Sequence, residues 1–255
     1  VGVNALLSRL LGEGKKDRAK VTADNAVLLA IIASIAFAIF GAIGTKAFFD
    51  AQTNSDSIRS LGYSYLSIVS IFSFGLILEV TYERILQSTG KTIYNMITQG
   101  IGAIINIILD PILIFGLLGA PKMGVAGAAI ATVAGQIVAM ILSFVFNMKY
   151  NEEVDITFGK HIFKPDFIII KDIYKVGIPS IAMQSMSTLM MLGLNKILVR
   201  YSDMAVNVLG IYYKLQSFVF MPIFGLNNGM TPIVAYNYGA RNKDRIMKVL
   251  KYSFL

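Results

Sequence analysis

Six long apolar stretches set the strongest limit on what this chain can fold into. They lie at about 21–44, 58–80, 92–118, 124–146, 176–199 and 204–234, and each contains few charged residues. An α-helix of about 20 apolar residues is long enough to cross the hydrocarbon core of a bilayer. Only 15% of the residues are charged, whereas soluble domains have roughly 25%. The sequence therefore predicts an all-α polytopic membrane protein.

The residue composition argues against several kinds of chemistry. The chain has no cysteine, which excludes disulfides and thiolate sites, and its single histidine, His161, is a poor basis for a metal site or a proton relay. It contains neither the GxxxxGK[ST] loop of nucleotide hydrolases nor the HExxH sequence of metalloproteases. We therefore expect a protein that is not an enzyme and that holds no cofactor.

The net charge of +8 comes from short loops between the apolar stretches. When the loops are assigned to alternate sides of a membrane, 17 lysines and arginines fall on one side and 4 on the other. Cytoplasmic loops are enriched in these residues, so we expect the loops 8–21, 82–92, 147–176 and 237–252 to be cytoplasmic. This distribution favours a multi-pass protein of the plasma (inner) membrane with lipid around it, and not a nucleic-acid-binding protein.

One polar turn occurs twice in the chain. Gly12–Arg18 (GEGKKDR) returns 227 residues later as Gly239–Arg245 (GARNKDR), with six apolar stretches between the copies. An even number of spans returns both copies to the same side, as in a parallel repeat. We therefore expect a fragment of a twelve-helix protein made of two six-helix bundles: 1–147 from the end of helix 2 to helix 6, 148–175 a cytoplasmic connector, and 176–255 helices 7, 8 and the start of 9.

Small residues predict close packing of one span, and helix-breaking residues predict an interruption of another. Gly127, Ala131 and Gly135 recur every four residues, a spacing that lets two helices approach closely in lipid. Prolines and glycines at 222, 225, 229 and 232 predict an interrupted helix in the last span, as in transporters with discontinuous helices.

An ionisable residue, Asp110, lies inside the apolar stretch IGAIINIILDPILIFGLL (101–118). A carboxylate within a membrane is unfavourable and usually faces a bundle interior or a water-filled cavity. Thr98, Gly102, Asn106 and Asp110 follow at four-residue steps, which places them on one helical face. Asp110 is then either an ion- or proton-binding acid or a structural, hydrogen-bonded acid beside Pro111, and Asn106 is either its partner or a helix-packing amide.

Other polar residues within the spans are candidates for substrate contact. Glu79 lies near the cytoplasmic end of the second span, and the fifth span carries a loose stripe of Gln184, Thr188 and Asn195 beside methionines such as Met191. Thioether side chains repack easily around varied ligands, but helix packing explains the same stripe. For Glu83 we expect an interfacial capping role beside Arg84.

Five stretches make the chain resemble the multidrug and toxic compound extrusion (MATE) family. They are ERILQSTGKT (83–92), NIILDPILIFG (106–116), GVAGAAIAT (124–132), GIPS (177–180) and PIVAYNYGARNKDR (232–245). The resemblance implies a secondary active multidrug antiporter that expels cationic or amphiphilic small molecules in exchange for Na+ or H+. The alternative is a flippase for lipid-linked or polysaccharide precursors on a related two-bundle plan.

The resemblance also implies roles for particular residues. Several family members bind the coupling ion through an Asn and an Asp four residues apart on the fifth helix and a Thr on the sixth, which Asn106, Asp110 and Thr132 match. A carboxylate on the first helix completes that site, and no segment of this sequence matches that helix. Some members use a Glu on the seventh helix instead, and the span at 176–199 has no acid. Apart from Na+ at Asp110 we expect no metal, and we expect a monomer.

Overall fold

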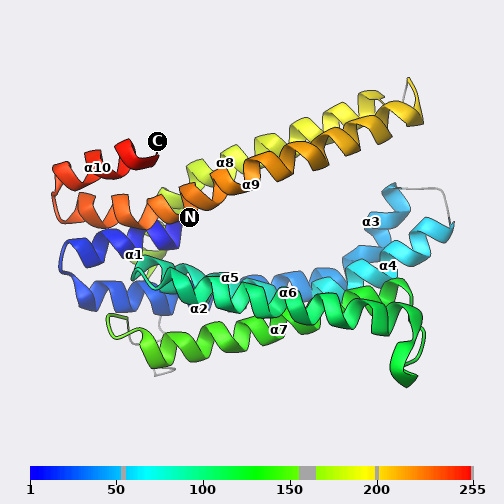
Figure 1. Ribbon diagram of the computed structural model, residues 1–255, viewed down its shortest axis with the longest axis horizontal. Coiled ribbons are helices and arrows are strands. Elements are labelled where there is room, and N and C mark those ends of the chain that lie inside the picture. Colours follow the sequence, from blue (N-terminus) through cyan, green and yellow to red (C-terminus); the bar gives the residue numbers. More distant parts are fainter. Residues whose placement is uncertain (53–55, 155–164, 199–200, 254–255) are drawn as a thin grey trace. The chain divides into compact units, whose positions relative to one another are not determined.

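The computed structural model describes residues 1–52, 56–154, 165–198 and 201–253 of the chain, and its regular elements within these ranges are all helical (Figure 1). They are α1 (Gly2–Gly12), α2 (Lys16–Ile39), the π-helical turn η1 (Phe40–Gly44), α3 (Thr45–Gln52), α4 (Asp56–Ile71), α5 (Phe74–Ser88), α6 (Thr92–Phe115), the 3₁₀ turn η2 (Leu117–Gly119), α7 (Val125–Tyr150), α8 (Phe167–Leu198), α9 (Asp203–Gly239) and α10 (Lys243–Ser253). His161 lies outside the described residues, so the prediction about it stays open.

The described helices include several that can cross a membrane. Four are long and apolar enough: Lys16–Asp50, Thr92–Phe115, Val125–Tyr150 and Val208–Gly239. A fifth is formed if α4 and α5, which meet at a 47° bend, act as one broken span. The predicted all-α membrane fold is therefore confirmed, and helix α8 covers the predicted span at 176–199 as far as Leu198.

Three details of the predicted spans are wrong. The first predicted span, at about 21–44, is part of a longer helical run, because α2, η1 and α3 follow one another without a break from Lys16 to Gln52. Helix α8 starts at Phe167, well before the expected span. The predicted interruption of the last span is absent, because helix α9 runs through Pro222 and Pro232. Each proline removes one backbone donor. Intramembrane helices tolerate that loss where neighbouring groups satisfy the freed carbonyls.

The chain packs into two compact units, which are described separately. Unit 1 contains residues 1–19 and 167–255, and unit 2 contains residues 20–166. The predicted segments 1–147, 148–175 and 176–255 follow the covalent order of the chain and stay a prediction. Packing instead groups α1 with α8 and α9.

In unit 2, α7 packs against α5 and α6 through small residues. A Cβ atom added to Gly127 would come within 2.6 Å of the Leu113 carbonyl oxygen, and one on Gly135 would come as close to the Gly102 carbonyl oxygen. Both distances are shorter than a real contact, so α6 and α7 approach backbone to backbone at these glycines, as their spacing predicted. Aromatic rings pack beside this seam, with Tyr82 and Phe144 centroids 5.4 Å apart.

In unit 1, α1 crosses α9 at two glycines, one from each copy of the repeated turn. A Cβ atom on Gly12 would overlap the carbonyl oxygen of Tyr236, and a Cβ atom on Gly239 would overlap the carbonyl oxygen of Arg9. Since 227 residues separate Gly12 from Gly239 and also Arg9 from Tyr236, the two contacts are equivalent and reciprocal. We call this the glycine crossing.

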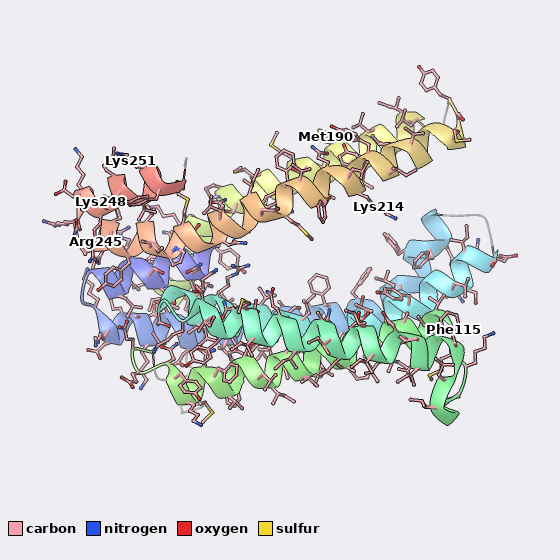
Figure 2. All side chains as sticks on the ribbon, in the orientation of Figure 1. Phe115, Met190, Lys214, Arg245, Lys248 and Lys251 are labelled. Carbon is pink, nitrogen blue, oxygen red and sulfur yellow. The ribbon has the colours of Figure 1, made fainter. Side chains whose placement is uncertain are left out.

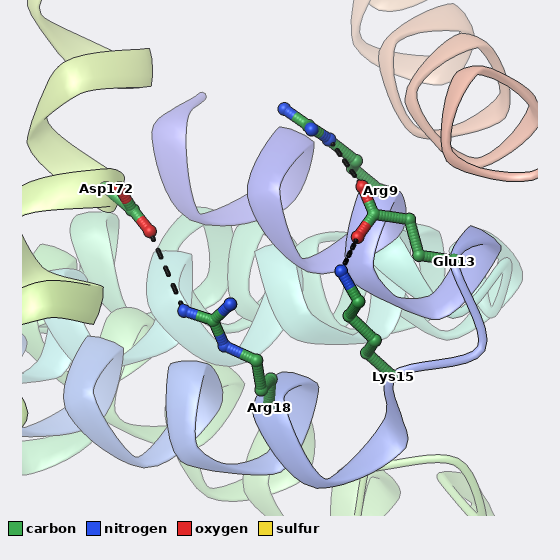
Figure 3. Close-up of polar contacts among 5 residues, drawn as sticks. All are labelled: Arg9, Glu13, Lys15, Arg18 and Asp172. Carbon is green, nitrogen blue, oxygen red and sulfur yellow. Dashed lines mark hydrogen bonds and ion pairs between the residues drawn. The ribbon is translucent and has the colours of Figure 1, made fainter.

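The backbone of the repeated turn is the same in both copies. The Lys15 amide donates to the Leu10 carbonyl at 2.9 Å, and the Asn242 amide donates to the Asn237 carbonyl at 2.9 Å. Helix α2 begins at Lys16, and α10 begins at the equivalent Lys243. Hydrogen bonds that close the last turn of a helix in this way are typical of C-terminal caps, and their agreement supports the predicted repeat. Arg18 then pairs with Asp172 of α8 at 3.9 Å (Figure 3).

Candidate functional site

The candidate site lies in unit 2, where α6 carries Asp110 and Asn106. Both side chains are half-buried. Pro111 is inside the helix and has no amide to donate to the carbonyl four residues earlier, so it leaves the backbone beside Asp110 less rigidly paired. Acidic residues within membrane segments commonly mark the pathways of ions or protons.

Asn106 connects the acid to the neighbouring helix. Its Nδ2 atom lies 3.5 Å from Asp110 Oδ1 and 3.4 Å from Thr132 Oγ1 of α7. These bonds are long, and the Thr132 hydroxyl donates a shorter bond of 2.9 Å to the Ala128 carbonyl. The structure thus brings together the three residues predicted for the ion site. The two hydrogen bonds of Asn106 are long, so a ligand can replace them at little cost.

A cavity of about 330 Å³ lies between α5, α6 and α7 beside these residues. Its polar walls are formed by Glu79, Glu83, Gln99, Asn106, Thr132 and Gln136. Leu76, Val80, Ala103 and Ala139 supply apolar surface, and Gly102 and Gly135, which approach each other closely, also line the cavity. Glu79, predicted as a substrate residue, therefore shares one cavity with two of the predicted ion-site residues.

The two glutamates of this cavity have different surroundings, although they lie four residues apart on α5. Glu83 is 3% exposed and accepts hydrogen bonds from Gln99 Nε2 at 2.9 Å and Thr98 Oγ1 at 3.4 Å. Glu79 is 8% exposed, and no donor in the described part of the chain reaches its carboxylate. The Glu83 carboxylate thus binds Thr98 and Gln99 of α6, two contacts that the predicted capping role beside Arg84 did not include.

Two glutamines of the cavity were not predicted. Gln99 orients Glu83, and the Oε1 atom of Gln136 is buried without a hydrogen bond from any described residue. Buried polar atoms are normally paired, so the Gln136 oxygen is an acceptor available to a ligand. Its position four residues after Thr132 on α7 was the available sequence signal, since such residues share a helical face.

The predicted substrate residues of α8 belong to unit 1 and lie on a largely exposed part of the helix. Gln184, Thr188, Met191 and Asn195 are all at least partly exposed, and the Thr188 hydroxyl donates to the Gln184 carbonyl within its own helix. The nearby Met190 is 56% exposed (Figure 2).

Among the described residues, no cluster of three histidine or acidic side chains could hold a metal ion. The cavity in unit 2 instead combines carboxylates with neutral oxygen donors from amides and a hydroxyl. Carboxylate and carbonyl oxygens suit hard cations. Two carboxylates in one small cavity also repel each other, and a bound cation or a proton relieves that repulsion.

Comparison with known proteins connects this arrangement to a transporter family. The MatE family model matches residues 1–112 and 179–255. The multidrug export protein MepA of Staphylococcus haemolyticus (strain JCSC1435) is 32% identical over 255 residues, and MepA of Staphylococcus aureus (strain MSSA476) is 30% identical over the same length. Each match covers 98% of this chain and 54% of the relative.

A solved structure agrees with these relatives. The structure of the MATE multidrug transporter DinF-BH superimposes with a TM-score of 0.89 at 28% identity, over 99% of this chain and 56% of that structure. This chain therefore spans about half the length of the curated relatives and of the solved structure that it matches.

Proposed function

The chain belongs to the MatE family of multidrug transporters, and from that membership we propose that it is part of a secondary active multidrug antiporter. The complete protein expels organic cations in exchange for Na+ or H+. Two relatives are named multidrug export proteins, which supports the transport class. The cavity in unit 2 supports the proposal of cationic substrates and of coupling to Na+ or H+.

The observation that carries this proposal is the position of Asn106 between Asp110 and Thr132. Asp110 binds the coupling ion or proton, and Thr132 supplies a hydroxyl oxygen. Asn106, whose Nδ2 faces both residues, supplies its amide oxygen after a rotation of the amide group. Na+ is a hard cation and prefers such oxygen ligands. Binding neutralises an intramembrane carboxylate, and that change of charge favours one packing of the surrounding helices over another.

The cavity also supports cationic substrates. Its volume of about 330 Å³ is at the lower end of the range for small-molecule sites, which starts at about 300 Å³. Glu79 supplies negative charge, the aliphatic walls supply apolar contact, and no described lysine or arginine lines the cavity. In the second half of the protein, Gln184, Thr188, Met191 and Asn195 of α8 form part of the substrate path once partner helices cover them.

The charge distribution supports the orientation of the protein, with the turns at 8–21, 82–92, 147–176 and 237–252 on the cytoplasmic side. We further propose that the protein is a monomer in the plasma membrane. Export then moves substrate away from the side that carries the basic turns.

The test is ethidium transport by the full-length protein in everted membrane vesicles, driven by an imposed Na+ or H+ gradient. We compare the wild type with Asp110→Asn, which keeps the shape of the side chain and removes its charge. The matched control is Asp56→Asn on α4, since Asp56 has a 94% exposed side chain and pairs with Arg59 at the surface, where such a pair contributes little.

We expect Asp110→Asn to abolish gradient-driven transport at normal expression, by about 10²-fold or more, while Asp56→Asn stays within twofold of the wild type. The gradient that drives the wild type identifies the coupling ion. Full coupled transport by Asp110→Asn would instead make the Asn106–Asp110 pair structural.

A further inference from the structure

A second site lies in unit 1, beside the glycine crossing, and shares no residue with the cavity in unit 2. A basic cleft of about 800 Å³ is lined by Arg9, Glu13, Lys15, Tyr238, Gly239, Arg241, Lys243 and Ile246. Both copies of the repeated turn contribute to it. It therefore lies where the polar turns meet the ends of the apolar helices.

The basic cleft carries a surplus of positive charge. Arg9 Nε and Lys15 Nζ bind the two oxygens of Glu13 at 2.8 and 2.7 Å (Figure 3). These hydrogen bonds hold the pKa of Glu13 below its usual value, so its carboxylate is ionised at neutral pH. Arg241 and Lys243 form no ion pair with a described residue, which leaves four cations around one acid.

The backbone at Arg241 gives an independent reason to assign a role to its side chain. Arg241 has φ of 55°, and the equivalent residue of the first copy is Gly14, with φ of 74°. Glycine adopts this left-handed conformation without strain, whereas a side chain makes it unfavourable. An arginine that occupies a strained position and lines a cleft is a candidate for a ligand contact.

The basic cleft adjoins an apolar groove of about 500 Å³, and the two share Arg9 and Tyr238 as a common wall. The groove is lined mainly by apolar residues of α1, α8, α9 and α10: Ala5, Leu6, Val176, Met230, Val234, Ala235 and Leu250, with Asn227 and Thr231. The Arg9 guanidinium lies 5.6 Å from the centre of the Tyr238 ring, a distance at which a cation and an aromatic face attract. Arg9 is thus fixed where the charged and apolar surfaces meet.

From this pairing of surfaces we propose that unit 1 binds an anionic phospholipid, with its phosphate headgroup in the basic cleft and an acyl chain in the apolar groove. Basic pockets at the cytoplasmic ends of membrane helices are suited to such headgroups. The site depends on the membrane orientation proposed above but not on which compound or ion is transported.

Native mass spectrometry of the full-length protein in neutral detergent tests the site. The probes are phosphatidylglycerol and phosphatidylcholine with identical acyl chains, and inorganic phosphate as a competitor. The variant is Arg241→Gly, which removes the charge and restores the residue found in the first copy, so the fold should be kept or stabilised. The control is Lys248→Gln, which removes one positive charge from α10 outside both the cleft and the groove.

We expect the wild type to retain phosphatidylglycerol at least tenfold better than phosphatidylcholine. Arg241→Gly should lower this preference about fivefold without lowering the melting temperature, since one basic side chain near an anionic surface typically contributes an effect of this size. Lys248→Gln should stay within about twofold of the wild type.

Three outcomes would overturn the proposal. Equal retention of the two lipids in the wild type would mean that the cleft does not select an anion. An unchanged preference for phosphatidylglycerol in Arg241→Gly would mean that Arg241 does not bind the headgroup. Displacement of phosphatidylglycerol by equimolar inorganic phosphate would mean that the cleft binds free phosphate and that the apolar groove contributes nothing.

Discussion

The two copies of the repeated turn have the same backbone but different side chains. In each copy a helix ends at a glycine, closes with the same hydrogen bonds and passes through a left-handed residue into the next helix. Glu13 and Gly14 in the first copy correspond to Ala240 and Arg241 in the second. The comparison indicates that the glycine crossing constrains the backbone and the terminal glycines, while the turn itself is free to differ in charge.

The largest effect is expected from adding a methyl group at the glycine crossing. Gly12→Ala and Gly239→Ala would each place a Cβ atom on a backbone oxygen of the opposite helix, and backbone moves less easily than a side chain. Each variant should lose about 1–3 kcal/mol of stability, measured as a lower melting temperature of the purified full-length protein.

Gly193→Ala on α8 is the control, because nothing lies within 4 Å of a Cβ atom at Gly193. It should be neutral or slightly stabilising, since alanine favours a helix over glycine. Because the crossing is reciprocal, the losses in Gly12→Ala and Gly239→Ala should be similar. A loss in only one of them would contradict the equivalence of the two copies.

A smaller effect is expected from exchanging the left-handed residues of the two turns. Gly14→Arg places a side chain at φ of 74°, and Arg241→Gly removes one from φ of 55°. The first change should destabilise the protein by about 1 kcal/mol and the second should stabilise it by up to about 1 kcal/mol. Differential scanning calorimetry measures both, and shifts of the same sign would show that the two turns are not interchangeable.

The smallest effect on stability is expected from Glu13→Gln, which removes the acid that only the first copy of the turn carries. Hydrogen bonds from Lys15 and Arg9 lower the pKa of Glu13 below its usual 4.5. A lowered pKa in the folded state gives stability that is present above pH 4.5 and is lost as the pH falls through the folded-state pKa. Between about pH 5 and pH 3, the melting temperature of Glu13→Gln should therefore fall less than that of the wild type.

Ala240→Gln at the equivalent position is the control for this acid. Since neither Ala240 nor glutamine titrates, this variant should keep the pH dependence of the wild type. An identical pH dependence in Glu13→Gln and the wild type would mean that the contacts to Glu13 are equally strong in the unfolded chain.

Local patterns in the sequence predicted the features that depend on one helix or one turn. The apolar stretches predicted the membrane fold, the spacing of Gly127 and Gly135 predicted the close packing of α7, and the repeated Gly12 motif predicted equivalent turns. Each depends on properties that neighbouring residues determine, namely hydropathy, the 3.6-residue helical period and the left-handed conformation after a helix.

Features that depend on the meeting of two helices were predicted less well. Asn106 and Thr132 were paired through a family resemblance, but the burial of Glu83 was missed because Thr98 and Gln99 approach it from another helix. The continuity of α9 through Pro222 was missed for a related reason. Whether a proline interrupts a helix depends on partners for the freed carbonyl, and the local sequence does not contain that information.

The glycine crossing also bears on how a chain of this kind arose. Residue i of one copy contacts residue j of the other, and residue j contacts residue i in return, which is the geometry of an isologous interface in a two-fold homodimer. A half-length ancestor with a single turn of the Gly12 type would already have had a surface complementary to its own copy. Joining two such genes would then have made a permanent intramolecular contact out of a dimer interface.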